Sequence, residues 1–518
     1  MAENQYNFLG LIFICFLSLI LLVLVSLLKR RSKQTTRLHL PPSPPSLPFI
    51  GHLHYLRTAP FCKSLHNLST RYGPLLYLRL GAKRCLVVSS LSMAAEIFKT
   101  HDLDFASRPS FAFAKELPLG NLGIFGSPYG NYWRFMKKLC MTELLSDRQL
   151  ERSRAVRHEE IVRLLKVVLE LANKKEVVNM GTELMKLTNS IVSRLLLSIR
   201  CGEQGDEAEK ITELVKESFE VGSKMCFGDI LGPFKGLAFR LYGRHAMDVT
   251  RRYDEIFERV LKQHEEGGKR EAKDFVDVLL RVLKYDNAEV KITRDHIKGI
   301  LLDLYGGGTG STAEGIQWAI AEVINHPDIF KKIREEIKSV VGSTRLVEES
   351  DIPRLPYLRA VVKETLRLHT PVPVAPRECL KSCKIKGFDI PEKTMVAINL
   401  YAIMRDPELW DNPTEFRPER FLISDKDKDN FEGADRMELI NFIPFGAGRK
   451  SCPGLMFALS MLHTTIAVMV QCFDFKVGGE GDQAKINMQA GAGGLSLSMA
   501  HPVICLPVVH FNPFASEA

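Results

Sequence analysis

The chain has 518 residues, of which 45% are hydrophobic and 25% charged, and its formal net charge at pH 7 is +9. This is an ordinary globular balance, with enough apolar residues for a large core. A charge of +9 over this length is too diffuse to argue for nucleic-acid binding, but it is compatible with a lipid surface or an acidic protein partner.

The eleven cysteines are widely scattered and include no Cys-x-x-Cys pair. Cys379 and Cys383 lie close in sequence, but they have no His or Cys companion at the spacing of a zinc site. An odd, dispersed set indicates reduced thiols in a cytosolic compartment and argues against a disulfide framework.

An apolar segment at residues 8–28 is long enough to cross a bilayer, because a helix of this length spans roughly 30 Å. Basic residues follow at positions 29–33, which places the rest of the chain on the cytosolic side. The alternative is a cleaved signal peptide, which would be shorter and would carry its charges on the other flank. We therefore expect residues 1–33 to form an uncleaved membrane anchor with a basic stop.

A proline-rich stretch at residues 41–48 ends near Gly51. Such prolines form a stiff, extended spacer, so we expect residues 34–51 to be a hinge that sets the height of the catalytic domain above the lipid. The alternative, a site for proline-reading domains, is less favoured so close to a membrane.

The remaining residues, 52–518, show no internal repeat and no low-complexity linker, which favours one large domain. Two strands are predicted at 75–80 and 85–89, around a turn at Gly81-Ala82-Lys83. Helical periodicity dominates afterwards, and strand-like pieces return after residue 385. The predicted fold class is mostly α with a minor β part, and long helices are expected at approximately 152–173, 206–222, 245–266, 293–325 and 328–341.

The helical pattern at 293–325 contains three consecutive glycines, Gly306 to Gly308. Each glycine inside a helix costs roughly 1 kcal/mol relative to alanine. The glycines therefore mark a place where the backbone bends or where a flat group approaches it. A kink filled by ordinary packing is the alternative.

One cysteine, Cys452, lies in a glycine-containing turn that runs from Phe445 to Gly454, with Arg449 and Lys450 before it. Glycines allow unusual backbone conformations and close approach of a flat partner, and the basic pair would stabilise a thiolate. An isolated thiolate held in this way suits a soft metal centre such as haem iron. The alternatives are a phosphate-binding loop, whose spacing this stretch lacks, and a small core cysteine.

The turn resembles the haem-binding loop of the cytochrome P450 superfamily, in the pattern Phe-x-x-Gly-x-Arg-x-Cys-x-Gly. The resemblance covers essentially the whole chain after the anchor. It implies the cytochrome P450 fold, a single large catalytic domain behind an N-terminal transmembrane helix. It also implies that Cys452 is the proximal ligand of haem b, that Phe445 belongs to the cofactor loop, and that Arg449 pairs with a haem propionate.

Other stretches match the same family in the expected order. Glu364 and Arg367, on one face of a helix, resemble its Glu-x-x-Arg motif, and Arg420 lies in a segment similar to its Pro-Glu-Arg-Phe motif. The resemblance implies a buried charge network that braces the cysteine loop, although such a pair alone would be a weak surface ion pair.

Three further residues resemble propionate ligands of the family. Trp133 and Lys137 fall at i, i+4 on one helix, where the family often has Arg at the second place, and Arg377 matches another basic position more loosely. Without the resemblance, the first pair would equally fit an amphipathic helix with a solvated basic face.

The glycine-rich helix is similar to the family's oxygen-binding helix, commonly Ala-Gly-x-Asp-Thr-Thr. Gly310 replaces the usual acid and Ser311 the usual alcohol, followed by Thr312. The resemblance implies catalytic roles for Ser311 and Thr312 and leaves the source of protons open. Glu314, four residues after Gly310, is a candidate proton source.

The resemblance implies a plant microsomal monooxygenase that uses O2 and electrons from NADPH through a separate reductase, in the endoplasmic reticulum membrane. The expected substrate is hydrophobic, a pentacyclic triterpenoid first and a flavonoid or isoflavonoid second. A haem-thiolate isomerase or dehydratase that needs no O2, and a non-enzymatic haem sensor, are alternatives. Apolar segments at 110–129, 225–242 and 491–497 are expected to contact the substrate, with no nucleic acid involved.

Overall fold

The computed structural model describes residues 38–56, 60–109, 122–200, 235–266, 274–285, 289–422, 442–478, 485–491 and 496–515, with isolated positions near the N-terminus, in the 117–119 region and between 210 and 231. Of the expected anchor, only Cys15, Leu17, Ser18 and Leu21 fall within this part, and all four are helical and exposed. The rest of residues 8–28 and most of the helix expected at 206–222 lie outside the described residues.

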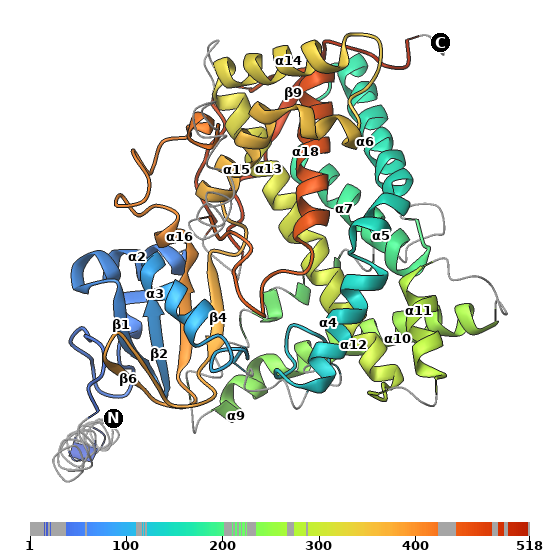
Figure 1. The fold of residues 1–518 in the computed structure, drawn as a ribbon. Coiled ribbons are helices and arrows are strands. Elements are labelled where there is room, and N and C mark those ends of the chain that lie inside the picture. Colours follow the sequence, from blue (N-terminus) through green and yellow to red (C-terminus); the bar gives the residue numbers. More distant parts are fainter. Residues whose placement is uncertain are drawn as a thin grey trace, which may run out of the picture.

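The main sheet and the β5-β6 pair lie at one side of the molecule, next to the helix-rich region, whereas β9 lies among the helices near α14 and α18 (Figure 1). The main sheet has the strand order β1-β2-β7-β4, in which β2 and β7 are parallel and the other pairs antiparallel. The smaller sheets are β3-β9-β8 and β5-β6. The strands are β1 Leu75–Leu80, β2 Lys83–Val88, β3 Val178–Asn179, β4 Val374–Glu378, β5 Cys383–Ile385, β6 Phe388–Ile390, β7 Met395–Asn399, β8 Phe473–Lys476 and β9 Ile504–Val509.

The predicted hairpin is confirmed, with a tighter turn than expected. Lys83 already belongs to β2 and pairs with Leu80, so only Gly81 and Ala82 form the turn. Gly81 has a φ of +57°, a left-handed conformation that glycine adopts without a steric penalty.

Helices make up the larger part of the described fold. The helices predicted at 152–173, 245–266, 293–325 and 328–341 correspond to α6 Arg154–Lys174, α10 Arg244–Glu266, α12 Arg294–Gly308 with α13 Gly310–Asn325, and α14 Pro327–Val341. The α-helices are α2 Phe61–Tyr72, α3 Leu91–Ala95, α4 Asn131–Glu143, α5 Asp147–Arg152, α6 Arg154–Lys174, α7 Met180–Leu197, α9 Lys235–Ala238, α10 Arg244–Glu266, α11 Phe275–Leu283, α12 Arg294–Gly308, α13 Gly310–Asn325, α14 Pro327–Val341, α15 Pro356–Leu368, α16 Leu400–Ile403 and α18 Leu455–Cys472. The shorter helical turns are η1 Leu53–Leu56, η2 Glu96–Thr100, η4 Phe239–Gly243, η5 Glu349–Arg354 and η6 Pro418–Phe421.

The main core forms where α7, α13, α15 and α18 pack together. Within the described residues, α18 has the length and mean hydropathy, 1.7, of a membrane span, but 67% of that segment is buried inside the protein. An apolar helix enclosed by other helices is typical of a core element.

The long helix predicted at 293–325 is interrupted at Thr309, where φ is −91° and ψ is −75°. It therefore forms two helices, α12 and α13, and the prediction that the glycines mark a bend is confirmed. A Cβ added at Gly306 or Gly307 would meet open space, whereas one at Gly308 would lie 3.1 Å from Val192. One side of the break is thus packed and the other side is free to accept a flat group.

The proline-rich segment is attached to the β part. Pro42 O accepts a hydrogen bond from Tyr77 N at 2.9 Å, and His52 Nε2 lies 2.8 Å from Pro44 O. Residues 41–52 therefore lie against β1.

Candidate functional site

Two glycines give the cysteine turn its shape. Gly446 and Gly448 have φ values of +69° and +73°, which favour glycine over any residue with a Cβ. A Cβ at Gly448 would also lie 2.5 Å from Asp102 Oδ1. The turn closes with a hydrogen bond from Cys452 N to Phe445 O at 3.0 Å, so the thiol is held on a fixed backbone just before α18.

The Cys452 thiol is accessible to solvent-sized groups although protein atoms surround it. The residue is exposed, yet burial raises the pKa of the thiol, while the Gly454 backbone N–H, Arg108 and Lys137 act to lower it. A thiol that is both enclosed and accessible faces an internal space. The positive charges beside it favour the thiolate form that a soft metal requires.

Arg108 and Lys137 act on this thiol, and Arg377 and Lys450 lie beside these two cations. Asp102 and Asp303 partly balance the four positive charges. Burial, reinforced by the neighbouring cations, lowers the pKa of Lys450 to about 7 and that of Arg377 to about 9. Arg108 Nε is buried without a hydrogen-bond partner among the described residues. Desolvated cations in excess, with an unused donor, are suited to binding carboxylate groups of a ligand.

Two basic residues of the turn, Arg449 and Lys450, are candidates for the propionate contact expected of Arg449. Counted from Phe445, the family pattern places its arginine at position 450, which is a lysine here. The Arg449 guanidinium is 43% exposed and is engaged by Asp102, whereas Lys450 is 4% exposed and lies 4.3 Å from the centroid of the Trp133 ring. Because two basic residues stand side by side in the turn, backbone direction decides which one points inward, and that residue is Lys450.

The helix α4 brings Trp133 and Lys137 to the same place, as predicted. The Trp133 indole N–H donates to Ile124 O at 2.9 Å, so this N–H already has a partner in the protein. Lys137 Nζ donates to Arg449 O at 2.5 Å and lies 5.1 Å from the Trp133 ring centroid. Arg377, on β4, reaches the same turn, with one guanidinium nitrogen 3.5 Å from Ala447 O.

At the helix break, Ser311 Oγ donates to Gly307 O at 2.7 Å and Thr309 Oγ1 donates to Tyr305 O at 2.8 Å. Thr312 is buried. The two hydroxyls that make these bonds satisfy carbonyl oxygens at the end of α12, which stabilises the interrupted geometry. Ser311 is half-buried and can still accept a hydrogen bond.

A carboxyl group lies one turn beyond the break. Glu314 Oε1 accepts a hydrogen bond from Ser496 Oγ at 3.2 Å, and its Oε2 is buried without a hydrogen-bond partner among the described residues. Burial raises the pKa of Glu314 to about 7. The side chain can therefore hold and release a proton near neutral pH, which Gly310 cannot do.

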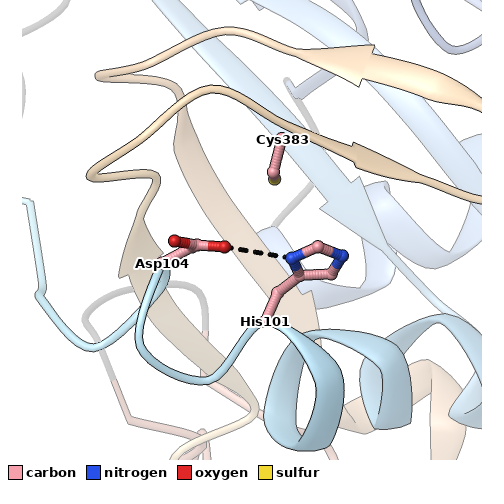
Figure 2. A group of neighbouring side chains, drawn as sticks. All are labelled: His101, Asp104 and Cys383. Atoms are coloured by element: carbon pink, nitrogen blue, oxygen red, sulfur yellow. Dashed lines mark hydrogen bonds and ion pairs between the residues drawn. The ribbon is translucent and has the colours of Figure 1, made fainter.

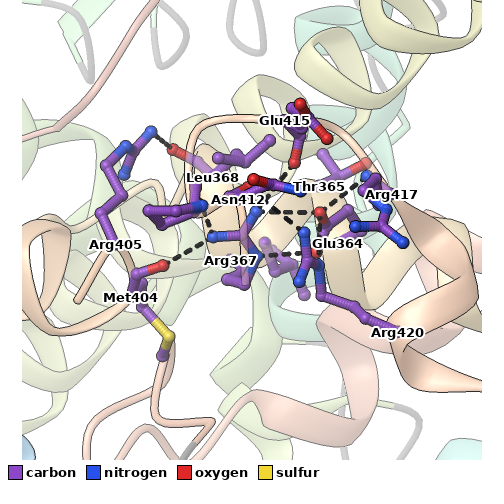
Figure 3. Close-up of polar contacts among 12 residues, drawn as sticks. Glu364, Thr365, Arg367, Leu368, Met404, Arg405, Asn412, Glu415, Arg417 and Arg420 are labelled. Atoms are coloured by element: carbon purple, nitrogen blue, oxygen red, sulfur yellow. Dashed lines mark hydrogen bonds and ion pairs between the residues drawn. The ribbon is translucent and has the colours of Figure 1, made fainter. Parts of the chain in front are cut away.

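Glu364, Arg367 and Arg420 form the expected charge network (Figure 3). Glu364 and Arg367, on α15, are both completely buried and make two parallel bonds of 2.7 and 2.8 Å. Arg420 Nε lies 3.0 Å from Glu364 Oε1. The remaining Arg367 donors reach carbonyl oxygens of Met404, Pro413 and Glu415. In the described residues, the network therefore braces the segment that precedes the cysteine turn.

The donor set around Cys452 fits haem: a thiol for a soft metal, cations for acidic arms, and a glycine face where a flat ring can approach.

Sequence reasoning missed Arg108 and the inward direction of Lys450, since a single arginine 344 positions from the cysteine carries no spacing signal. It also missed Asp303, a half-buried α12 residue whose carboxyl pKa is raised to about 6 by desolvation. Parts of the expected substrate segments, residues 110–116, 225–230 and 492–495, lie outside the described residues.

Comparisons with known proteins agree with this geometry. Residues 41–503 match the family model described as Cytochrome P450. The chain is 46% identical to cytochrome P450 705A5 of Arabidopsis thaliana over 90% of this chain and 91% of that protein. It is 40% identical to beta-amyrin 24-hydroxylase of Glycine max over 98% and 99% of the two chains, and 40% identical to 3,9-dihydroxypterocarpan 6A-monooxygenase of Glycine max over 97% and 98%.

Proposed function

The chain belongs to the cytochrome P450 family and is a cytochrome P450 monooxygenase, and from this premise we propose that it oxidises a pentacyclic triterpenoid with electrons supplied by NADPH through a separate reductase. The observation that carries the monooxygenase site is the Cys452 thiol, accessible, enclosed and flanked by desolvated cations. The triterpenoid is supported by the likeness to beta-amyrin 24-hydroxylase.

In this proposal Cys452 is the haem ligand, and Lys450, Arg377, Arg108 and Lys137 hold the propionates. The bound haem-thiolate supplies the activation of O2 and its insertion into a C–H bond. The cysteine turn would fix the thiol, and Gly306 and Gly307 present a side without neighbouring atoms, which would leave room for a flat ring.

Protons are delivered by residues of α13 in the same proposal. Glu314 holds a proton at Oε2 and passes it through water to the lone pair of Ser311 Oγ, whose own proton must first leave its hydrogen bond to Gly307 O. Thr312 supplies a further hydroxyl on the next position of the helix. Glu314 would thus take the role of the acid that Gly310 replaces. A path that delivers protons favours a monooxygenase, because an isomerase does not consume protons.

The substrate is tested with microsomes that contain the full chain and a plant reductase. Beta-amyrin, a pterocarpan and a flavonoid are supplied with and without NADPH, and products are measured by mass spectrometry. We expect a product 16 mass units heavier from the triterpenoid, formed only with NADPH. If only the pterocarpan is turned over, the substrate is a pterocarpan and not a triterpenoid. If an isomeric product forms without NADPH, the enzyme does not need a reductase.

Residues 1–33 are proposed as the membrane anchor and the endoplasmic reticulum as the location. The reductase would dock near α4, where Arg134 and Lys138 are exposed. Surface charges of this kind are screened by salt, so reductase-supported turnover should fall as ionic strength rises. Removal of residues 1–33 should release the protein from membranes and leave haem bound.

A further inference from the structure

A second group of possible metal ligands lies in the β part, on segments different from those of the cysteine turn. His101 follows η2, Asp104 lies three residues later, and Cys383 begins β5 (Figure 2). One ligand atom from each lies within 4.8 Å of the other two, and all three residues are half-buried. Figure 2 shows the Cys383 sulfur pointing toward the His101–Asp104 pair.

A fourth donor stands beside these three. The buried Cys379 thiol hydrogen-bonds with the Cys383 sulfur, and its sulfur also lies 3.1 Å from Lys381 O. The Cys383 thiol, the His101 imidazole and the Asp104 carboxylate form the close group, and the Cys379 thiol reaches it through its contact with Cys383. The four positions span residues 101 to 383.

Backbone hydrogen bonds hold the two segments in place. Leu380 N donates to Asp104 O at 2.7 Å, Glu378 N donates to Ser107 O at 2.9 Å, and Cys379 N donates to Thr394 O at 2.9 Å. His101 Nδ1 lies 3.0 Å from Asp104 Oδ2, which orients the ring. The donors therefore stand on a rigid frame, as a metal site requires.

We propose that His101, Asp104, Cys379 and Cys383 bind one zinc ion. Thiolate, imidazole and carboxylate are the ligands that zinc takes, and four such groups complete the tetrahedral shell of a structural site. Tetrahedral ligands at zinc stand roughly 3.6 Å apart, so the three described atoms need to approach by about 1 Å. Binding releases the thiol protons to solvent and makes no other bond change.

This zinc site is distinct from the haem site, because its ligands follow η2 and β4 or begin β5, while the haem thiol would be that of the turn before α18. The sequence shows no companions for Cys379 and Cys383 at the spacing of a zinc site, and the proposed site needs none at that spacing. The companions come from a segment more than 270 residues earlier in the chain, which no local motif could indicate.

The test uses the full-length, haem-loaded enzyme, reduced, freed of metal with a chelator and then equilibrated with zinc sulfate. Zinc content is measured by mass spectrometry, and zinc-edge X-ray absorption identifies the ligands. We expect about one zinc ion per chain with sulfur ligands at about 2.3 Å, and a higher midpoint of thermal unfolding when zinc is present.

Cys383→Ser should bind zinc at least about a hundredfold more weakly, since loss of a ligand exceeds the 10–100-fold effect typical of outer-shell partners. His101→Gln is a second variant, and Lys384→Ala, which changes an exposed neighbour on the same strand, is the control. The thiolate-type haem spectrum should be retained in all three.

Three results would overturn the proposal. Zinc could be absent from the wild-type protein, or X-ray absorption could show only nitrogen and oxygen ligands. Equal zinc content and equal zinc-induced thermal stabilisation in Cys383→Ser would place the metal elsewhere. A Cys379–Cys383 disulfide in freshly alkylated protein would assign the pair to redox chemistry instead.

Discussion

Ser311 Oγ donates a hydrogen bond to Gly307 O at 2.7 Å, across the break between α12 and α13. The same hydroxyl therefore stabilises the break and can accept a proton from the side of Glu314. A structural role and a proton-transfer role predict different consequences when the hydroxyl is removed.

We expect Ser311→Ala to keep substrate binding but to divert reducing equivalents to hydrogen peroxide. Loss of one hydrogen bond worth about 1.4 kcal/mol would change the ratio of product to NADPH consumed about tenfold. Ser311→Thr keeps the hydroxyl and is the control. An unchanged ratio in Ser311→Ala would transfer the role to Thr312 or to water alone.

Glu314→Gln should remove the decline in product formation on the alkaline side of the pH profile. The acid donates only while protonated, so wild-type product formation should decline as pH rises through about 7, the pKa of Glu314. The Gln variant should be slower below pH 7 and should lack this decline. A profile identical to wild type would exclude Glu314 as the donor.

The same variant has a stability readout that does not depend on turnover. Burial raises the pKa of Glu314 from 4.5 to about 7, so the folded protein binds the proton more tightly than the unfolded chain. The free energy of unfolding therefore falls between pH 4.5 and 7, by up to about 3 kcal/mol from this group. Glu314→Gln should be the more stable protein at pH 8 and should lose its advantage at pH 4.

Lys450→Gln should weaken haem retention, because it removes an inward cation from the set around Cys452. A charge-assisted hydrogen bond contributes about 1.5–3 kcal/mol, so transfer of haem to apomyoglobin should accelerate by about tenfold or more. Arg449→Gln, which removes an exposed partner of Asp102, is the matched control and should change the rate little. If Arg449→Gln accelerated haem transfer more than Lys450→Gln does, Arg449 would be the propionate ligand.

Cys452→Ser should abolish the thiolate-type spectrum of the reduced, carbon-monoxide-bound haem, since a hydroxyl cannot replace the thiolate. Cys383→Ser should retain that spectrum, because its thiol belongs to the separate cluster with His101 and Asp104. If the spectrum survives in Cys452→Ser, Cys452 is not the haem ligand. If it is lost in Cys383→Ser alone, Cys383 is the haem ligand instead.

Glu364→Gln should destabilise the protein by about 3–5 kcal/mol, because it leaves the buried Arg367 and Arg420 without their anion. Glu419→Gln, which breaks a more exposed ion pair with Lys332, should cost less than about 1 kcal/mol. Denaturant midpoints with haem content as a second probe measure both. If both substitutions lowered the free energy of unfolding by the same amount, the Glu364 network would stabilise the protein no more than the exposed ion pair does.

Local sequence patterns determined several elements of the fold and the backbone of the candidate site. The glycines before Cys452, the helix periods, the hairpin around Gly81 and the glycine break before Ser311 each depend on neighbouring residues, since backbone sterics and side-chain period act over one or two turns. The order of these motifs was enough to indicate the family, which the comparisons confirm.

Tertiary structure alone decided which side chains meet. Lys450 points inward and Arg449 outward because the turn packs on Asp102, and Arg108 joins the cations from a distant segment. Glu314 gains its raised pKa from burial beside Ser496, and His101 reaches Cys383 only through pairing of the segments around β4. Desolvation and long-range contact depend on the packed chain, so no local spacing could have predicted them.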